Sequence, residues 1–333
     1  MPSFDPTNVN LDTASVEDIY CYLQLSGNDY NGHLGARISA IFVILITSSA
    51  CTLFPVVAKR IPRWNIPYPV YLFARYFGTG VIVATAFIHL LDPAYGSIGS
   101  TTCVGVSEHW ADYSWCPAIV LVSVLMVFLI DVASEVYVER VYGVEREYDA
   151  TDRFLAQANL IQSDDEIESE RSFRKDIAAF LILEFGIIFH SVIIGLNLGV
   201  TGDEFTTLYP VLVFHQAFEG LGIGARMSAL RFGRHWWLPW VLCMAYGLTT
   251  PISIAIGIGV RTTYNSGSRT ANIVQGVLDA VSAGILIYSG LVELLARDFL
   301  FDPDRAKRRS HLLGMIFCVL LGAGIMALIG KWA

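Results

Sequence analysis

Eight apolar stretches, each about 18 to 23 residues long, follow one another along this 333-residue chain. A bilayer core of roughly 30 Å needs about 20 apolar residues to cross as a helix, so each stretch is long enough to span a membrane. The stretches are Ile38–Val57, Val70–Leu91, Ala118–Tyr137, Ile177–Leu198, Leu208–Met227, Leu238–Val260, Val274–Leu295 and Leu312–Ile329. Only 16% of all residues are charged, against about 25% in soluble proteins. We therefore expect an all-α integral membrane protein with eight transmembrane helices.

Positive charge alternates between the connections. The first, third, fifth and seventh connections hold 17 Lys and Arg residues, and the opposite side holds only 4. Because positive residues are retained in the cytosol, this pattern predicts that both termini are extracellular or lumenal. The chain then divides into an outer N-terminal tail (1–37), three helices (38–137), a cytosolic acidic loop (138–176) and five further helices (177–333).

The charge and the cysteines exclude several classes of protein. A net charge of −8 without a long basic run argues against nucleic-acid binding, which needs clustered Lys and Arg. The six cysteines form no Cys-x-x-Cys motif, so zinc fingers and thioredoxin-like sites are also excluded. On the outer side, Cys103 and Cys116 are candidates for a disulfide. Unpaired thiols are the alternative, because spacing does not fix connectivity.

The cytosolic loop Val138–Asp176 contains 11 acidic and 6 basic residues. Such a composition predicts a largely disordered segment, including the acidic run Ser163–Glu170. The loop is either a solvated linker or a regulatory segment that a kinase or the ubiquitin system modifies. The candidate modification sites are Ser163, Ser169, Ser172 and Lys175.

Ionisable residues inside membrane helices are energetically expensive, so they mark candidate functional sites. His215 and Glu219 are four residues apart, which places both on one face of a helix where they can share a cation. His190 and Asn197 are seven residues apart and lie along one stripe of the preceding helix. Imidazole nitrogen with carboxylate and amide oxygen suits Zn²⁺ or Fe²⁺ better than Ca²⁺ or Mg²⁺.

Several other residues of the apolar stretches bear on this site. His89 ends the second stretch and is either an entry ligand or an ordinary interfacial histidine. Small residues allow close helix approach, so we expect the glycines of the two site helices to bring these helices together. Those glycines are Gly195, Gly199, Gly220, Gly222 and Gly224. The remaining acids are expected to be structural for the most part: Asp131, Glu135, Glu184, Asp279 and Glu293.

The same residues resemble the ZIP (Zrt-, Irt-like) metal transporters, and specifically the fungal and plant branch of that family. The resemblance rests on His190-Ser191 with Gly195 and Leu198-Gly199, and on His215-Gln216 with Glu219-Gly220. Three further blocks agree with it and extend it over most of the chain: Phe87–Leu91, Gln275–Tyr288 and Gly322–Ala333.

The resemblance implies eight helices with both termini outside, a metal path between the fourth and fifth helices, and zinc uptake across the plasma membrane. It implies that His190, His215 and Glu219 are ligands of the transported ion, with Ser191 and Gln216 beside a second metal position. Zn²⁺, and also Fe²⁺ as a candidate, would then be substrates, and no cofactor is expected. A homodimer is a further candidate state.

Two departures from the family pattern limit these expectations. Members with a two-metal centre carry a carboxylate four residues after the fourth-helix histidine, where this chain has Ile194, so one tight site with a weaker neighbour is favoured. The cytosolic loop contains no histidine, which excludes metal sensing there through imidazoles. An intramembrane zinc hydrolase, which would recruit His89, His190, His215 and Ser191 and use Glu219 as base, is the alternative class.

Overall fold

The computed structural model describes residues 13–25, 30–61, 67–141, 161–230, 232, 235–301 and 309–332. All regular elements in these residues are helical. In chain order they are α1 (Val16–Gln24), α2 (Leu34–Arg60), α3 (Tyr68–Ala84), η3 (Thr85–Leu91), α4 (Asp92–Ile98), η4 (Glu108–Trp110), α5 (Trp115–Val141), α7 (Ile161–Val200), α8 (Phe205–Ala229), α9 (Leu238–Val260), α10 (Arg269–Tyr288), η6 (Ser289–Phe301), α11 (Arg309–Ile329) and η7 (Gly330–Trp332).

Seven helical segments of the described chain are long and apolar enough to cross a membrane. They are Leu34–Arg60, Pro69–Ile98, Trp115–Tyr137, Asp176–Val200, Leu238–Val260, Arg269–Phe301 and Arg309–Trp332. The remaining long helix, α8, has 25 residues but is less apolar. The expectation of an all-helical membrane protein is thus confirmed, while an eighth crossing by α8 stays a prediction.

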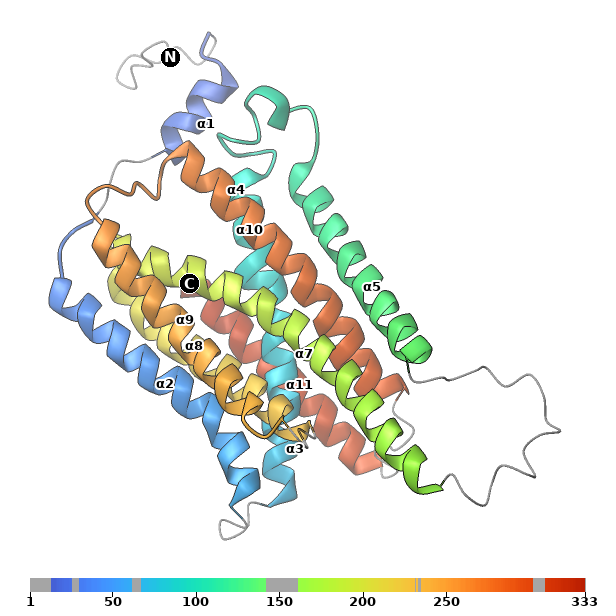
Figure 1. Ribbon diagram of the computed structural model, residues 1–333. Helices are drawn as coiled ribbons and strands as arrows, with labels where there is room; N and C mark the ends of the chain where they lie inside the picture. Colours follow the sequence, from blue (N-terminus) through green and yellow to red (C-terminus); the bar gives the residue numbers. More distant parts are fainter. Residues whose placement is uncertain are drawn as a thin grey trace.

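The long helices form one bundle in which α2 and α5 lie on opposite sides (Figure 1). The most extensive contacts join α3 with α11, α2 with both α8 and α9, and α7 with α9. Many large apolar side chains of α5 point outward, as expected for a helix that faces lipid. This packing surrounds α8 with α2 and α3 and so places its polar residues inside the bundle.

The glycines of α7 and α8 pack against other helices. A Cβ on Gly199 of α7 would lie 2.7 Å from the Cα of Gly257 in α9, and a Cβ on Gly222 of α8 would lie 2.7 Å from the Cα of Gly78 in α3. The prediction that these glycines bring α7 and α8 together is therefore wrong at these positions. Instead, α7 packs closely against α9, and α8 packs closely against α3. These contacts fix the rotation of each site helix and its position along its axis.

The disulfide pairs Cys21 with Cys103, and the predicted pairing of Cys103 with Cys116 is wrong. Cys21 lies on the short helix α1, which docks on the segment after α4, and Gln24 of the same helix accepts a hydrogen bond from the backbone N–H of Cys103 at 2.6 Å. Cys116 is a free, buried cysteine. The long-range contact of α1 could not be read from the spacing of the cysteines.

The acidic run Ser163–Glu170 is helical, contrary to the expected disorder, because α7 begins at Ile161. Glu and Gln are good helix formers, and acids near a helix N-terminus interact favourably with the helix dipole. Residues 142–160 of the predicted loop lie outside the described residues.

Candidate metal centre

Three predicted ligands converge in the middle of the bundle. The Nε2 atoms of His190 and His215 are 3.3 Å apart, and the Nε2 of His215 lies 3.4 Å from a carboxylate oxygen of Glu219. One ligand atom from each residue lies within 4.8 Å of the other two. Ligands bound tetrahedrally at about 2.0–2.1 Å from a zinc ion are about 3.3–3.4 Å apart. The two measured separations match this value, and only the third pair, His190 with Glu219, would have to approach to hold an ion.

These side chains are buried and lack ordinary partners. His215 and Glu219 are fully buried, and His190 is 3% exposed. The Nδ1 atoms of both histidines and both oxygens of Glu219 make no hydrogen bond with a described residue. Buried polar groups of native proteins are normally satisfied, so the arrangement fits a site whose partner is an ion.

Local helix geometry explains the convergence. The four-residue spacing puts His215 and Glu219 on one face of α8, as predicted. The buried Arg37 of α2 holds the end of α7, because its guanidinium donates to the carbonyl oxygen of Leu198 at 2.9 Å and to that of Thr201. The sequence analysis did not single out Arg37, although a lone arginine at the start of an apolar stretch indicates a specific role.

His89 lies beside the cluster. It belongs to the π-helix η3, and its ring meets the ring of His215 edge to face with 4.8 Å between centroids. Its Nε2 lies 3.3 Å from the carbonyl oxygen of Met326. His89 is 6% exposed, so it is not the exposed interfacial histidine of the alternative reading. Single-turn π-helices often occur at functional sites because they rotate the side chains that follow.

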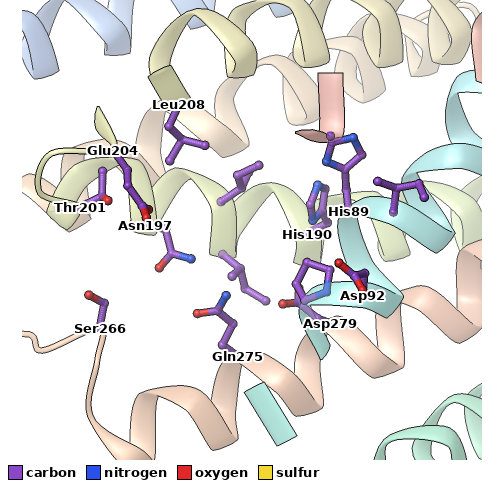
Figure 2. Close-up of a pocket in the computed structure, with 15 residues that line it drawn as sticks. His89, Asp92, His190, Asn197, Thr201, Glu204, Leu208, Ser266, Gln275 and Asp279 are labelled. Carbon is purple, nitrogen blue, oxygen red and sulfur yellow. The ribbon is translucent and has the colours of Figure 1, made fainter. Parts of the chain in front are cut away.

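A cavity of about 350 Å³ reaches the cluster from one end of the bundle (Figure 2). His89 and His190 line it together with three carboxylates, Asp92, Glu204 and Asp279. Its neutral polar residues are Asn197, Thr201, Ser266 and Gln275. Asn197 therefore lines the same cavity as His190, as the stripe predicted, and its role as a ligand stays a prediction.

The other two predicted site residues follow His190 and His215 directly in sequence, and their proposed place beside a second metal stays a prediction. Ser191 and Gln216 are fully buried, and their side-chain polar atoms make no hydrogen bond with a described residue. Gln216 takes part in the local packing through its backbone carbonyl oxygen, which accepts from the hydroxyl of Tyr246 at 3.1 Å.

The remaining membrane acids divide into two groups. Asp131 accepts from the hydroxyl of Tyr288 at 2.9 Å, and Glu293 pairs with Arg297 at 3.2 Å, which confirms structural partners for both. In contrast, Asp279 lines the cavity, and both oxygens of Glu184 lack a hydrogen-bond partner among the described residues.

Comparison with known proteins identifies the family. Residues 34–330 match the family model described as ZIP zinc transporter. The chain belongs to the ZIP zinc transporter family. It is 54% identical to zinc-regulated transporter 1 of Saccharomyces cerevisiae, over 99% of this chain and 97% of that protein. It is 41% identical to zinc-regulated transporter 1 of Schizosaccharomyces pombe, over 92% and 88% of the two chains.

Plant proteins match over a similar extent. Zinc transporter 5 of Oryza sativa is 32% identical over 96% of this chain and 93% of its own length. Membership of this family makes the chain an integral, multi-pass membrane protein of the transporter class and not an enzyme, so the hydrolase alternative is set aside. The resemblance inferred from the sequence motifs is confirmed.

Proposed function

We propose that this protein carries Zn²⁺ into the cytosol through a site formed by His190, His215 and Glu219. The observation that carries the proposal is the convergence of three buried ligand atoms from α7 and α8 within 4.8 Å. Two imidazoles and one carboxylate bind a zinc ion firmly yet leave a coordination position for water, which lets the ion leave again. Zinc-regulated transporter 1 of Saccharomyces cerevisiae, with 54% identity, supports zinc as the substrate.

The cavity gives the ion its way in. Asp92 and Glu204 create a negative field that attracts a hydrated cation. Asn197 and Gln275 then offer neutral oxygens as the ion loses water, and His89 stands at the entrance to the three ligands. We assign His89 to this entry step, with Asn197 above it as a weaker contact.

The distribution of Lys and Arg among the connections predicts the orientation of the protein in the membrane. We propose eight crossings, counting α8, with both termini outside and the cavity open to that side. At the opposite end, Arg75 of α3 pairs with Asp298 of η6 at 2.7 Å, and Arg226 of α8 donates to the carbonyl oxygen of Glu293 at 3.0 Å. These contacts tie the inner ends of α3 and α8 to η6, and we propose that they break when the ion is released inward.

The test is zinc flux into vesicles reconstituted with purified protein, followed with an internal zinc-sensitive dye. Wild-type protein should give saturable uptake, and the double variant His215→Ala, Glu219→Ala should lose it. His311→Ala, which removes an exposed imidazole of α11, is the matched control and should transport normally. Equal flux in wild type and double variant would contradict the proposal.

The same assay addresses the finer points. Titrating Fe²⁺ against Zn²⁺ ranks the two candidate substrates. Flux should fall as the pH drops, because protonated imidazole cannot bind metal. Labelling of a cysteine introduced at Ser266, which lines the cavity, from outside intact cells would support both the orientation and a plasma membrane location.

We also propose that the loop 138–176 regulates uptake through phosphorylation of Ser163, Ser169 or Ser172 or through ubiquitin at Lys175. The described part of this loop that follows residue 160 is helical and continuous with α7, which carries His190. A modification there is therefore mechanically connected to the site. Replacing the loop by a neutral linker should abolish any response of uptake to external zinc. An unchanged response would show that the loop is only a linker.

A further inference from the structure

A second cavity, of about 280 Å³, lies at the opposite end of the bundle from the entry cavity. Lys59 and Arg60, the last two residues of α2, line it. The other lining residues are Val56, Met227, Ser228, Leu230, Phe232, Trp236 and Pro239, from the end of α2 and the connection between α8 and α9. None of these lining residues is acidic, so the cavity combines two cationic side chains with an apolar wall.

Both cationic groups donate hydrogen bonds to backbone carbonyl oxygens. Lys59 donates to the carbonyl oxygen of Ser228, and Arg60 donates to that of Trp236 at 3.2 Å. The guanidinium of Arg60 also lies over the ring of Trp240, 5.0 Å from its centroid. Carbonyl oxygens and an aromatic face orient a cation without cancelling its charge. Both side chains therefore present positive charge at a fixed place.

The cavity lies at the level where lipid headgroups are found. The span Leu34–Arg60 ends there, and the span Leu238–Val260 begins there. Trp236 and Trp237 are 67% and 48% exposed, as expected for tryptophans at a membrane interface. Lys59–Pro67 and Arg226–Leu238 together contain six Lys and Arg residues and no Asp or Glu. The connection 138–176 is acidic by comparison, and the segment 297–309 contains three acids beside its five bases, so most of the net positive charge of this face lies here.

We propose that this cavity binds the phosphate headgroup of an anionic phospholipid from the adjacent leaflet. The guanidinium of Arg60 suits two phosphate oxygens, and Lys59 adds a point charge. The apolar wall formed by Val56, Phe232 and Pro239 accommodates the glycerol and the upper acyl chain. A free phosphate ion makes no favourable contact with an apolar wall, whereas an amphipathic lipid matches both the cationic and the apolar side of the cavity. Basic pockets between transmembrane helices are known to bind lipid headgroups.

The bound lipid would join three helices. It would contact the end of α2, the segment after α8 and the first turn of α9 through the lining residues. Because α8 carries His215 and Glu219, an anionic lipid there would stabilise the helix packing that supports the ligand cluster. That this leaflet is the cytosolic one rests on the orientation proposed above, whereas the binding itself does not.

The experiment measures retention of fluorescent phosphatidylserine by purified full-length protein in neutral phosphatidylcholine nanodiscs. The variant Lys59→Gln, Arg60→Gln should bind it roughly 30-fold more weakly, about fivefold for each charge removed. Arg140→Gln, Arg309→Gln is the matched control, because it removes two exposed charges elsewhere on the chain, outside the cavity. The control should retain nearly wild-type affinity. If the double variant fails to fold, the two single variants carry the test, each with the fivefold loss.

Three outcomes would overturn the proposal. Equal losses in the double variant and its control would show diffuse surface attraction, and equal retention of labelled phosphatidylcholine would show no preference for charge. If inorganic phosphate displaces the labelled lipid as effectively as unlabelled phosphatidylserine does, the cavity is a site for the free ion. Zinc flux is measured separately on the same preparations, so a loss of lipid binding is distinguishable from a failure of the proposed transport site.

Discussion

The substitution Gly78→Ala should impair zinc transport although Gly78 touches no metal ligand. A Cβ at this position of α3 would lie 2.1 Å from the Cα of Gly222 in α8, where ordinary contact begins at 3.4 Å. Backbone atoms cannot rotate away, so α3 and α8 must separate by at least about 1.3 Å, the difference between these two distances. Overpacking of this kind costs about 1–3 kcal/mol.

The displacement matters because Gly222 lies one turn beyond Glu219 on α8. Metal sites tolerate ligand distances that differ by only about 0.2 Å from ideal. A shift of α8 several times larger moves His215 and Glu219 relative to His190 of α7, so the three residues could no longer share one ion. Alanine is a better helix former than glycine by roughly 1 kcal/mol, which means that any loss comes from the helix crossing and not from helix propensity.

The assay is zinc uptake by reconstituted vesicles, normalised to the amount of folded protein. Gly78→Ala should reduce uptake at least tenfold, with the order of magnitude set by the ligand displacement. Gly314→Ala and Gly324→Ala, both in α11, are matched controls because a Cβ at either position meets nothing within 4 Å. Wild-type uptake and unchanged thermal stability in Gly78→Ala would refute the reasoning about the α3–α8 crossing.

Three further predictions follow from single contacts. Peptide mapping of unreduced protein should find Cys21 joined to Cys103, with Cys116 labelled by a thiol reagent only after unfolding; a Cys103–Cys116 peptide would contradict this pairing. Asp92→Asn should raise the zinc concentration for half-maximal uptake about fivefold with little change in maximal rate, since it removes one cavity charge worth about 1 kcal/mol. Arg37→Met should lower the free energy of unfolding by about 1–3 kcal/mol, measured by thermal denaturation, because the carbonyl oxygens at the end of α7 lose a charged donor.

The transmembrane architecture was largely predictable because it follows from local sequence. Apolar length alone located the helical spans, and the four-residue spacing alone placed His215 and Glu219 on one face. The convergence of His190 on the same point was also predictable. Polar stripes on two membrane helices avoid lipid by facing the interior of the bundle, where they meet.

Contacts between distant segments were not predictable in the same way. The role of Gly222 depends on which helix packs against α8, and that helix is α3, more than a hundred residues earlier in the chain. The disulfide depends on the docking of α1, whose few residues carry no signal for their partner. Spacing rules describe one helix at a time, whereas these features depend on the relative placement of two.

His89 shows how far such placement changes the chemistry of the site. The sequence of Thr85–Leu91 does not predict in which direction His89 points. In the structure this segment is the π-helix η3, and the His89 ring packs edge to face against the ring of His215. As a third imidazole at the entrance, His89 would bind the partly hydrated ion before His190 and His215 replace the water molecules that it still carries. Since nitrogen ligands bind Zn²⁺ far better than they bind Ca²⁺ or Mg²⁺, the proposed order of contacts would reject the commoner hard cations before they reach Glu219. Selectivity would then reside in η3 as much as in the buried ligand cluster. His89→Ala should accordingly weaken discrimination against Mg²⁺ in competition assays more than it lowers maximal zinc flux. Unchanged discrimination would show that selectivity depends on the ligands of α7 and α8 alone.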